Sequence, residues 1–169
     1  MQTTAPLQQH TWLLRMVGSW TFSGSGDMGP DQPPHEFSGV EEVRGLGNLW
    51  IVMEGRGAMP DGTPANTLMT LGYDTASGKF VGTWVGSMMT HLFTYEGSLD
   101  DAGRVLTLDS VGPSFAPGAM PGTMARYQDI IEQVSENHRI LRSRMVHDDG
   151  THTQFMEAHY HRAPGAMAR

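Results

Sequence analysis

The pattern most typical of a metal site lies near the C-terminus. In Glu157-Ala-His159-Tyr-His161, the alternation of a β-strand would place the carboxylate and both imidazoles on one face. Two imidazoles at this spacing can chelate Zn, Fe, Cu or Ni. The alternate residues, which include Met156 and Tyr160, are apolar, so we expect the Glu/His face to point to solvent. We therefore predict no metal here, and these three residues are the candidates if one binds.

Two other residues could act as a general acid or base. Glu54 stands in an otherwise apolar segment, and His91 precedes a segment that alternates with aromatic residues. An inward carboxylate or imidazole could carry out an isomerisation or cyclisation without a cofactor. For Glu54, an ion pair with Arg44 or Arg56 is the competing interpretation.

The remaining charged groups are expected at the surface. Arg142 and Arg144 share one face of a predicted strand and could together bind a carboxylate or phosphate, but the opposite face of that strand is the more apolar. Five histidines fall at helix, loop or strand-end positions, where exposure is the rule: His10, His35, His138, His147 and His152.

Short β-strands must position these side chains. Only residues 7–17 carry apolar residues at helical spacing, and Gly18 ends that pattern. The rest of the chain consists of segments rich in Val, Ile, Thr and aromatic residues, separated by turn residues. We predict ten strands near residues 20–28, 35–45, 49–59, 66–73, 79–87, 91–99, 105–111, 124–134, 139–147 and 153–162.

The links between these strands predict an up-and-down topology. Pro60-Asp61-Gly62 and Asp148-Asp149-Gly150 are tight-turn signatures, which favour antiparallel neighbours. Parallel strands would need crossovers of about a dozen residues or more, and no second helical pattern is present to supply them. Because a sheet of ten twisted strands tends to close, we predict an all-β, antiparallel up-and-down barrel. The N-terminal helix would plug one end, in one domain with the barrel at 18–162 and a short tail at 163–169.

Composition narrows the classes of function. The 169 residues carry a formal net charge of −7, which argues against a nucleic-acid partner. The absence of Cys excludes disulfides and thiolate chemistry and is compatible with a reducing cytoplasm, where we expect the protein. No apolar run approaches the roughly 20 residues of a membrane span, so we expect neither a membrane partner nor a signal peptide.

Several motifs resemble those of known barrels. Gly18-Ser-Trp20, just after the predicted helix, is similar to the G-x-W signature of lipocalins. The wider pattern resembles the bacterial family catalogued as domain of unknown function 1579, through Met69-Thr70-Leu71-Gly72-Tyr73-Asp74, Gly82-Thr83-Trp84-Val85-Gly86-Ser87-Met88-Met89, Tyr95-Glu96-Gly97 and Gly112-Pro113-Ser114-Phe115. The resemblance covers nearly the whole chain and implies a lipocalin-like (calycin) barrel. It implies no reaction, because the family has none assigned.

The strand pair at residues 79–87 and 91–99 predicts an internal cavity. Glycine alternates there with large aromatic residues on one face, which leaves room between the sheet walls. The chain also contains 13 Met, whose unbranched side chains suit an apolar pocket that adapts to its occupant. We predict that the cavity is lined by Trp84, Met88, Phe93, Tyr95, Met69 and Tyr127, with Glu54 as its polar residue. The alternative is a core in which Met fills irregular gaps.

We therefore expect a protein that binds a small apolar molecule and needs no cofactor. The first alternative is an enzyme, a cofactor-independent isomerase or cyclase that uses Glu54 or His91. The second is a haem protein, because Gly18–Gly26 is similar to the opening of nitrobindins, barrels whose haem iron is held by a His near the C-terminal end. That resemblance points to His159 or His161, with His91 as the internal alternative. Apolar residues on both faces of several strands are compatible with a homodimer.

Overall fold

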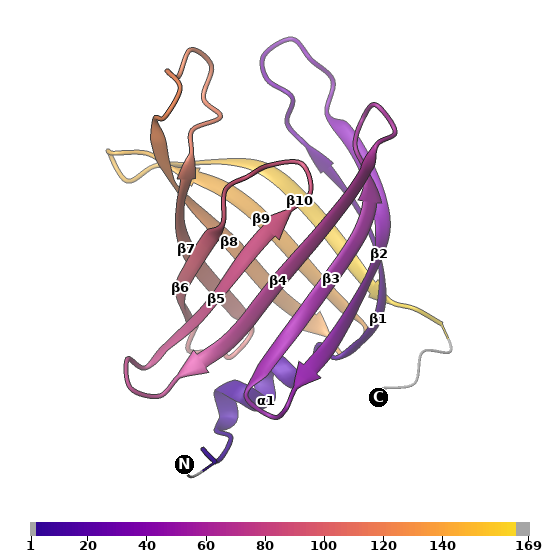
Figure 1. The fold of residues 1–169 in the computed structure, drawn as a ribbon, viewed down its shortest axis with the longest axis vertical. Helices are drawn as coiled ribbons and strands as arrows, with labels where there is room; N and C mark the ends of the chain where they lie inside the picture. Colours follow the sequence, from indigo (N-terminus) through magenta and orange to yellow (C-terminus); the bar gives the residue numbers. More distant parts are fainter. Residues whose placement is uncertain (1–2, 165–169) are drawn as a thin grey trace.

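The computed structural model describes residues 3–164 and confirms the predicted all-β barrel, closed by ten antiparallel strands and preceded by a short helix (Figure 1). The elements are α1 (Gln8–Leu14), β1 (Gly18–Gly26), β2 (His35–Leu46), β3 (Trp50–Ala58), β4 (Pro64–Asp74), β5 (Lys79–Gly86), β6 (Phe93–Leu99), β7 (Val105–Pro113), β8 (Met124–Ser135), β9 (His138–Val146) and β10 (His152–Arg162). Most of the tail predicted at 163–169 lies outside the described residues.

Every strand pairs with its neighbour in the sequence, and the first and last strands complete the ring. β1 pairs with β2 on one side and with β10 on the other, where Trp20 lies opposite Arg162. The register shifts at two positions, between Gln133 and Ser135 in β8 and between Gln154 and Met156 in β10. Because the ring is closed, each described strand has a neighbouring strand on both sides, which avoids the exposed edge strand of an open sheet.

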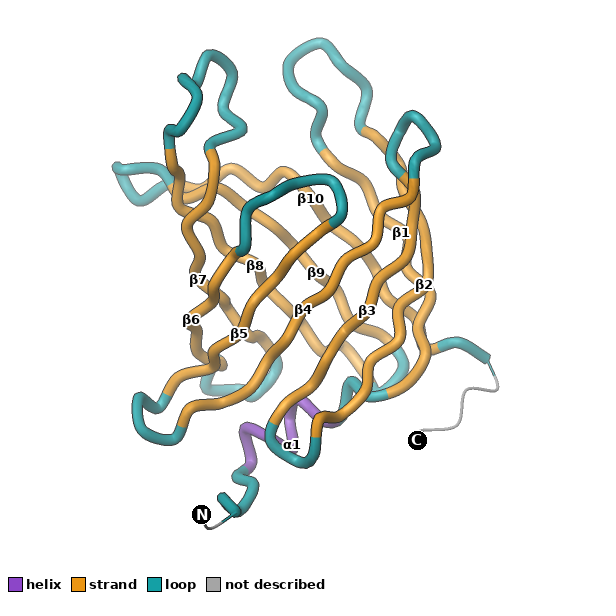
Figure 2. Tube along the Cα trace, viewed as in Figure 1, coloured by secondary structure: helices purple, strands orange, loops and turns teal. Residues whose placement is uncertain are grey.

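The two ends of the barrel differ in their connections. At one end the turns are short and α1 lies across the opening, whereas longer loops extend from the other end (Figure 2). The Gly/Pro-rich loops at 27–34 and 114–123 are both at the end opposite α1. We call these the helix end and the loop end.

The helix is shorter than predicted and is attached to the barrel by a buried histidine. It ends at Leu14 rather than at residue 17, and tighter turns follow, in which Met16 N donates to Leu13 O at 3.0 Å. His10, expected at the surface, is buried, because its Nδ1 accepts the Leu7 N–H at 2.9 Å and its Nε2 lies 3.1 Å from Tyr73 O. The imidazole thus supplies an acceptor that the first turn of a helix lacks. No helix in residues 3–164 is long and apolar enough to cross a membrane.

The interior of the barrel at the helix end is filled by packed side chains. Trp12, Leu13 and Met16 are buried against it, and the Trp12 indole N–H donates to Gly103 O at 2.8 Å. The strand residues packed in the same cluster are almost completely inaccessible: Ile51, Leu71, Phe80, Leu106 and Leu108. Open space inside the barrel is therefore confined to the part nearer the loop end.

Candidate functional site

A cavity of about 420 Å³ lies inside the barrel and opens at the loop end. Loop residues Met28, Met59 and Met88 contribute to its lining. The strands contribute mostly apolar side chains: Phe22, Phe37, Met53, Met69, Trp84, Ile131, Leu141, Met156 and Tyr160. Its volume falls within the range of about 300–1,000 Å³ that is typical of small-molecule pockets.

Strand alternation explains which residues reach the cavity. On β3, Met53, Gly55 and Gly57 point inward, while their neighbours point out. Of the residues predicted to line the cavity, Met69, Trp84 and Met88 do so. The methionines of the lining come from several strands and from the loops. The unbranched, flexible side chains that are numerous in the sequence therefore surround the open space.

The floor of the cavity is an ion pair that the sequence did not reveal. Arg139 on β9 pairs with Glu41 on β2, and both side chains are at least nine-tenths buried. The guanidinium carbon lies 4.5 Å from the ring centroid of Trp20 and 4.2 Å from that of Tyr160, within range of cation–π attraction. Burial lowers the pKa of Arg139 to about 10, so the group stays charged at neutral pH. Its Nη1 has no hydrogen-bond partner within residues 3–164.

Aromatic rings fill the side of the loop end formed by β6, β7 and β8. The ring centroids of Phe93 and Tyr127 are 6.3 Å apart, and Phe155 lies 5.9 Å from Tyr127. A Cβ at Gly112 would overlap the Phe93 ring, so this glycine makes room for an aromatic side chain rather than for a ligand. Phe93 and Tyr127, predicted to line the cavity, belong to this aromatic packing and do not line it.

Tyr95, also predicted as a lining residue, belongs to a polar cluster inside the barrel. Its hydroxyl donates to Asp129 Oδ2 at 2.5 Å, and the Ser143 hydroxyl donates to Asp129 Oδ1 at 2.5 Å. Burial raises the pKa of Asp129, and burial together with the adjacent carboxylate raises the pKa of Tyr95. The cluster satisfies its own polar atoms and does not contact the cavity.

The prediction that Glu54 faces the cavity is wrong. It alternates with the inward residues Met53 and Gly55, so its side chain lies on the outer wall, where it is 42% exposed and 3.6 Å from Arg44 Nη2. The apolar neighbours that suggested burial include Val52, which is an outward residue buried at 7% exposure. An apolar outer wall made the two faces of this strand look alike in the sequence.

His91 lies in the loop between β5 and β6, at the rim. Its Nε2 lies 3.1 Å from Val111 O, and its ring packs edge-on against Phe93 with centroids 4.7 Å apart. Because a carbonyl only accepts, Nε2 carries the proton, and this nitrogen is not available as a base. The residue does not line the cavity.

Glu157, His159 and His161 lie on the outer wall, as the alternation of β10 predicted, and a third imidazole joins them. His138, at the start of β9, has Nε2 at 2.9 Å from His159 Nδ1. The positions of His159 and His161 do not fit the haem ligand inside the barrel that the likeness to nitrobindins implied, because Ala158 and Tyr160 are the inward residues. On the same wall, Arg142 Nη1 donates to Glu132 at 2.8 Å and Arg142 Nε to Glu157 at 3.1 Å.

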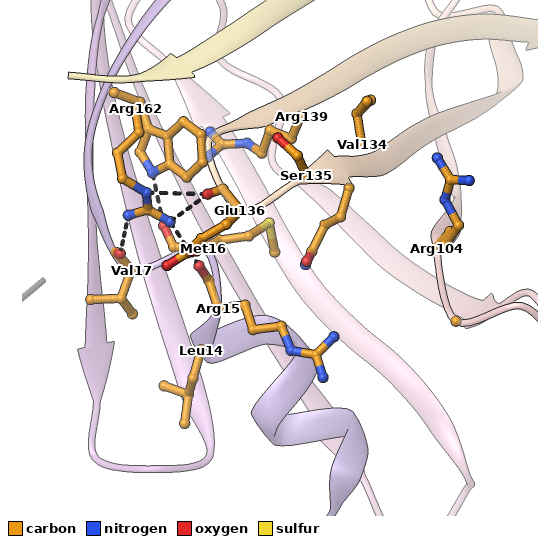
Figure 3. Close-up of a pocket in the computed structure, with 13 residues that line it drawn as sticks. Leu14, Arg15, Met16, Val17, Arg104, Val134, Ser135, Glu136, Arg139 and Arg162 are labelled. Atoms are coloured by element: carbon orange, nitrogen blue, oxygen red, sulfur yellow. Dashed lines mark hydrogen bonds between the residues drawn. The ribbon is translucent and has the colours of Figure 1, made fainter. Parts of the chain in front are cut away.

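A wider hollow lies at the helix end, and the guanidinium of Arg162 on its lining is engaged (Figure 3). Arg162 donates to Val17 O at 2.8 Å and to Arg15 O and Glu136 O at 3.0 Å each. Its guanidinium carbon lies 4.4 Å from the ring centroid of Trp20. These hydrogen bonds of Arg162 join the segment after the helix to the barrel. The internal cavity, which has the more apolar lining, is the candidate ligand site.

The sequence carried a signal for the missed ion pair. Glu41 lies on the same face of its strand as Phe37 and Val43, and Arg139 on the same face as Leu141. A single charge on an otherwise apolar face marks a buried polar group that needs a partner. What the sequence could not supply was the pairing, because the two strands lie on different parts of the barrel.

Comparisons with known proteins give one matching family and several similar structures. A family model described as "Protein of unknown function (DUF1579)" matches residues 5–162, and no curated protein matches. The crystal structure of Rv2717c from M. tuberculosis is similar, with a TM-score of 0.60 and 18% identity over 95% of this chain and 99% of that chain. A fluorescence-activating beta barrel designed de novo has a TM-score of 0.48 and 12% identity over 94% and 100% of the two chains. The redesigned beta barrel mFAP0, bound to DFHBI, has a TM-score of 0.48 and 11% identity over 88% and 99%.

Proposed function

The chain belongs to the DUF1579 family of proteins of unknown function, and we propose that it binds a small, mostly apolar molecule in the cavity of its barrel. The observation that carries the proposal is the cavity of about 420 Å³, whose wall is formed chiefly by methionine and aromatic side chains. Water in such a space finds few hydrogen-bond partners, so an apolar molecule that displaces it gains free energy.

The floor of the cavity gives the ligand an orientation. Arg139 and Glu41 balance each other in charge, and Arg139 Nη1 is still free to donate among the described residues. A buried donor without an acceptor costs free energy, which a ligand oxygen would recover. We therefore expect an apolar body with an acceptor oxygen at the inner end, where it would meet Nη1.

The enzyme hypothesis has less support. The carboxylate of the cavity lining belongs to Glu41, which is engaged by Arg139 rather than free to take a proton. Asp129 has a raised pKa, but both of its oxygens accept hydrogen bonds within the polar cluster. Binding needs only the apolar wall and one polar anchor, and both are present.

Binding can be tested with N-phenyl-1-naphthylamine, an uncharged probe that fluoresces in apolar surroundings. We expect saturable fluorescence with one probe per chain. Met69→Trp places a larger ring in the cavity and should weaken probe binding at least tenfold. Leu68→Trp is the matched control, because Leu68 is the outward neighbour on β4, and it should leave the affinity within twofold.

Circular dichroism would verify that each variant is folded, and Thr67→Phe offers a second lining variant if Met69→Trp does not fold. Native mass spectrometry of the purified wild type would identify any organic molecule that is retained. Equal probe affinity in the wild type and in both lining variants would contradict binding in this cavity.

The compartment and the oligomeric state stay predictions. The absence of Cys favours the cytoplasm. Val40, Leu68 and Val85 are exposed on the outer wall, a feature that supports the expected homodimer.

A further inference from the structure

Three histidines lie together on the outer wall of the barrel. His159 and His161 are two residues apart on β10, and His138 on β9 lies directly opposite His161. One ring nitrogen from each histidine lies within 4.8 Å of the other two. The His138 ring stacks on both neighbours, with its centroid 5.2 Å from that of His159 and 4.5 Å from that of His161.

An irregularity in β10 brings His159 and His161 to the face on which His138 lies. Before the register shift, Gln154 pairs with Arg144; after it, Met156 pairs with Ser143, and this register continues to the pair of His161 with His138. Without the extra residue, the alternation that follows Gln154 would continue along β10, so Tyr160 would lie opposite His138 on the outer wall and His159 and His161 would point into the barrel. The bulge therefore places two imidazoles of β10 on the same outer face as His138.

The hydrogen bonds around His159 match those of a metal ligand. Its Nε2 lies 3.0 Å from Glu157 Oε1, which fixes the proton on Nε2 and leaves Nδ1 as an acceptor facing His138. Glu157 is itself held by Arg142 Nε at 3.1 Å. A carboxylate that orients the imidazole through its other nitrogen is the usual partner of a histidine that binds a metal.

The charges around the cluster suit a cation. Glu157 and Glu132 both lie near the histidines, and Arg142 bridges the two carboxylates. The chain as a whole carries a formal net charge of −7.

We infer that His138, His159 and His161 form a site for a divalent transition-metal ion, with Zn²⁺ as the ion to test. Three imidazole ligands with a fourth position open to water are a donor set that zinc uses in proteins. Glu157 is not a ligand in this arrangement but the residue that orients His159. The site is independent of the internal cavity, because all three imidazoles are on the opposite side of the sheet from its lining.

Small side-chain rotations complete the site. With zinc–nitrogen bonds of about 2.0–2.1 Å and tetrahedral angles, ligand nitrogens lie about 3.3 Å apart. The pair of His138 Nε2 and His159 Nδ1 is already at 2.9 Å, and His161 is exposed and free to rotate. A proton now shared between the first two rings would shift to His138 Nδ1 when the metal takes its place.

Isothermal titration of untagged protein with Zn²⁺ tests the site. We expect one ion per chain, a loss of affinity of at least tenfold in His138→Gln, and a loss of about 10–100-fold in Glu157→Gln, which removes the orienting carboxylate. His152→Gln is the control, because His152 is an exposed histidine on β10 outside the cluster, and it should bind as the wild type does.

A second measurement is thermal unfolding with and without Zn²⁺. Binding to the folded state should raise the melting temperature of the wild type and of His152→Gln, but not that of His138→Gln. The ions are added alone, so the result does not depend on any ligand of the cavity. No binding by the wild type, or binding by His138→Gln at wild-type affinity, would overturn the inference.

Discussion

Glu41 and Arg139 lie 98 residues apart in the chain and form an ion pair inside the barrel. Their side chains are 9% and 3% exposed, and the pair separates the solid helix end from the cavity. Removing two charges from water costs several kcal/mol per ion, which their attraction and hydrogen bonds must repay. Trp20 and Tyr160 hold the guanidinium in place, so its position is set by packing as well as by charge.

Neutralising one partner of this pair should destabilise the barrel. Glu41→Gln leaves the Arg139 charge buried without a counter-ion, and we expect the free energy of unfolding to fall by about 3–5 kcal/mol. Urea denaturation of the wild type and the variant measures the difference. The double variant Glu41→Gln/Arg139→Met removes both charges and should regain part of the loss. A loss below about 1 kcal/mol in the single variant would show that the pair is better solvated than its burial indicates.

Arg162 should be needed to attach the helix end. Arg162→Lys loses the planar array of donors that binds the carbonyls of Val17, Arg15 and Glu136, and we expect a loss of about 1.5–3 kcal/mol in the free energy of unfolding. Arg126→Lys is the control, because Arg126 donates to one exposed carbonyl and its loss should cost under about 0.5 kcal/mol. Equal effects of the two substitutions would contradict a special role for Arg162.

Most of the fold could be predicted from the sequence, because local signals determine it. Alternation and turn residues predicted ten strands, and short turns left an antiparallel meander as the simplest topology. The family resemblance is also confirmed. The end of the helix was misjudged at residue 17, since the apolar pattern continues into the turns that follow Leu14. The buried His10 was missed because its partner, Tyr73, is distant in the chain.

The candidate site was less accessible to sequence reasoning. Alternation indicates which residues share a face, but the cavity occupies only one part of the interior, so Met69 lines it and Tyr127 does not. For Glu54, an apolar outer wall removed the contrast that tells the two faces apart. The cluster of His138, His159 and His161 depends on a bulge in β10, and no local sequence pattern predicts the extra residue of that bulge.

The close fit of Phe93 over Gly112 should make this glycine sensitive to the smallest side chain. A Cβ there would overlap the ring, so Gly112→Ala should lower the free energy of unfolding by about 1–3 kcal/mol. Phe93→Leu removes the ring, and in the double variant the added methyl group would meet open space. We therefore expect a coupling of at least about 0.5 kcal/mol in the double-mutant cycle. Additive losses of stability in this cycle would mean that the Phe93 ring moves aside without cost when the methyl group is added at residue 112.

Asp129 should make stability fall as the pH rises from about 4. Its pKa is raised in the folded protein, chiefly by burial, so over this range the folded state holds a proton that the unfolded chain, with an ordinary pKa of about 3.9, has released. The stability that Asp129 contributes by holding this proton is therefore fully present below the pKa of the unfolded chain. It is lost as the pH rises through the pKa of the folded protein. Asp129→Asn removes it, so the stability of the variant minus that of the wild type should increase with pH and level off above the folded pKa.

Urea denaturation between about pH 3 and pH 8 measures this difference, and Asp61, whose effect falls in the acidic part of this range, provides a control of opposite sign. Hydrogen bonds from Thr63 lower the pKa of the exposed Asp61, so its contribution is present above the unfolded pKa and is lost as the pH falls. For Asp61→Asn, the stability of the variant minus that of the wild type should thus decrease with rising pH. A flat difference curve for Asp129→Asn would mean that the carboxyl group titrates in the folded barrel as it does in the unfolded chain. In that case water must reach Asp129 from within the barrel, and the polar cluster would belong to the cavity rather than to its packed side.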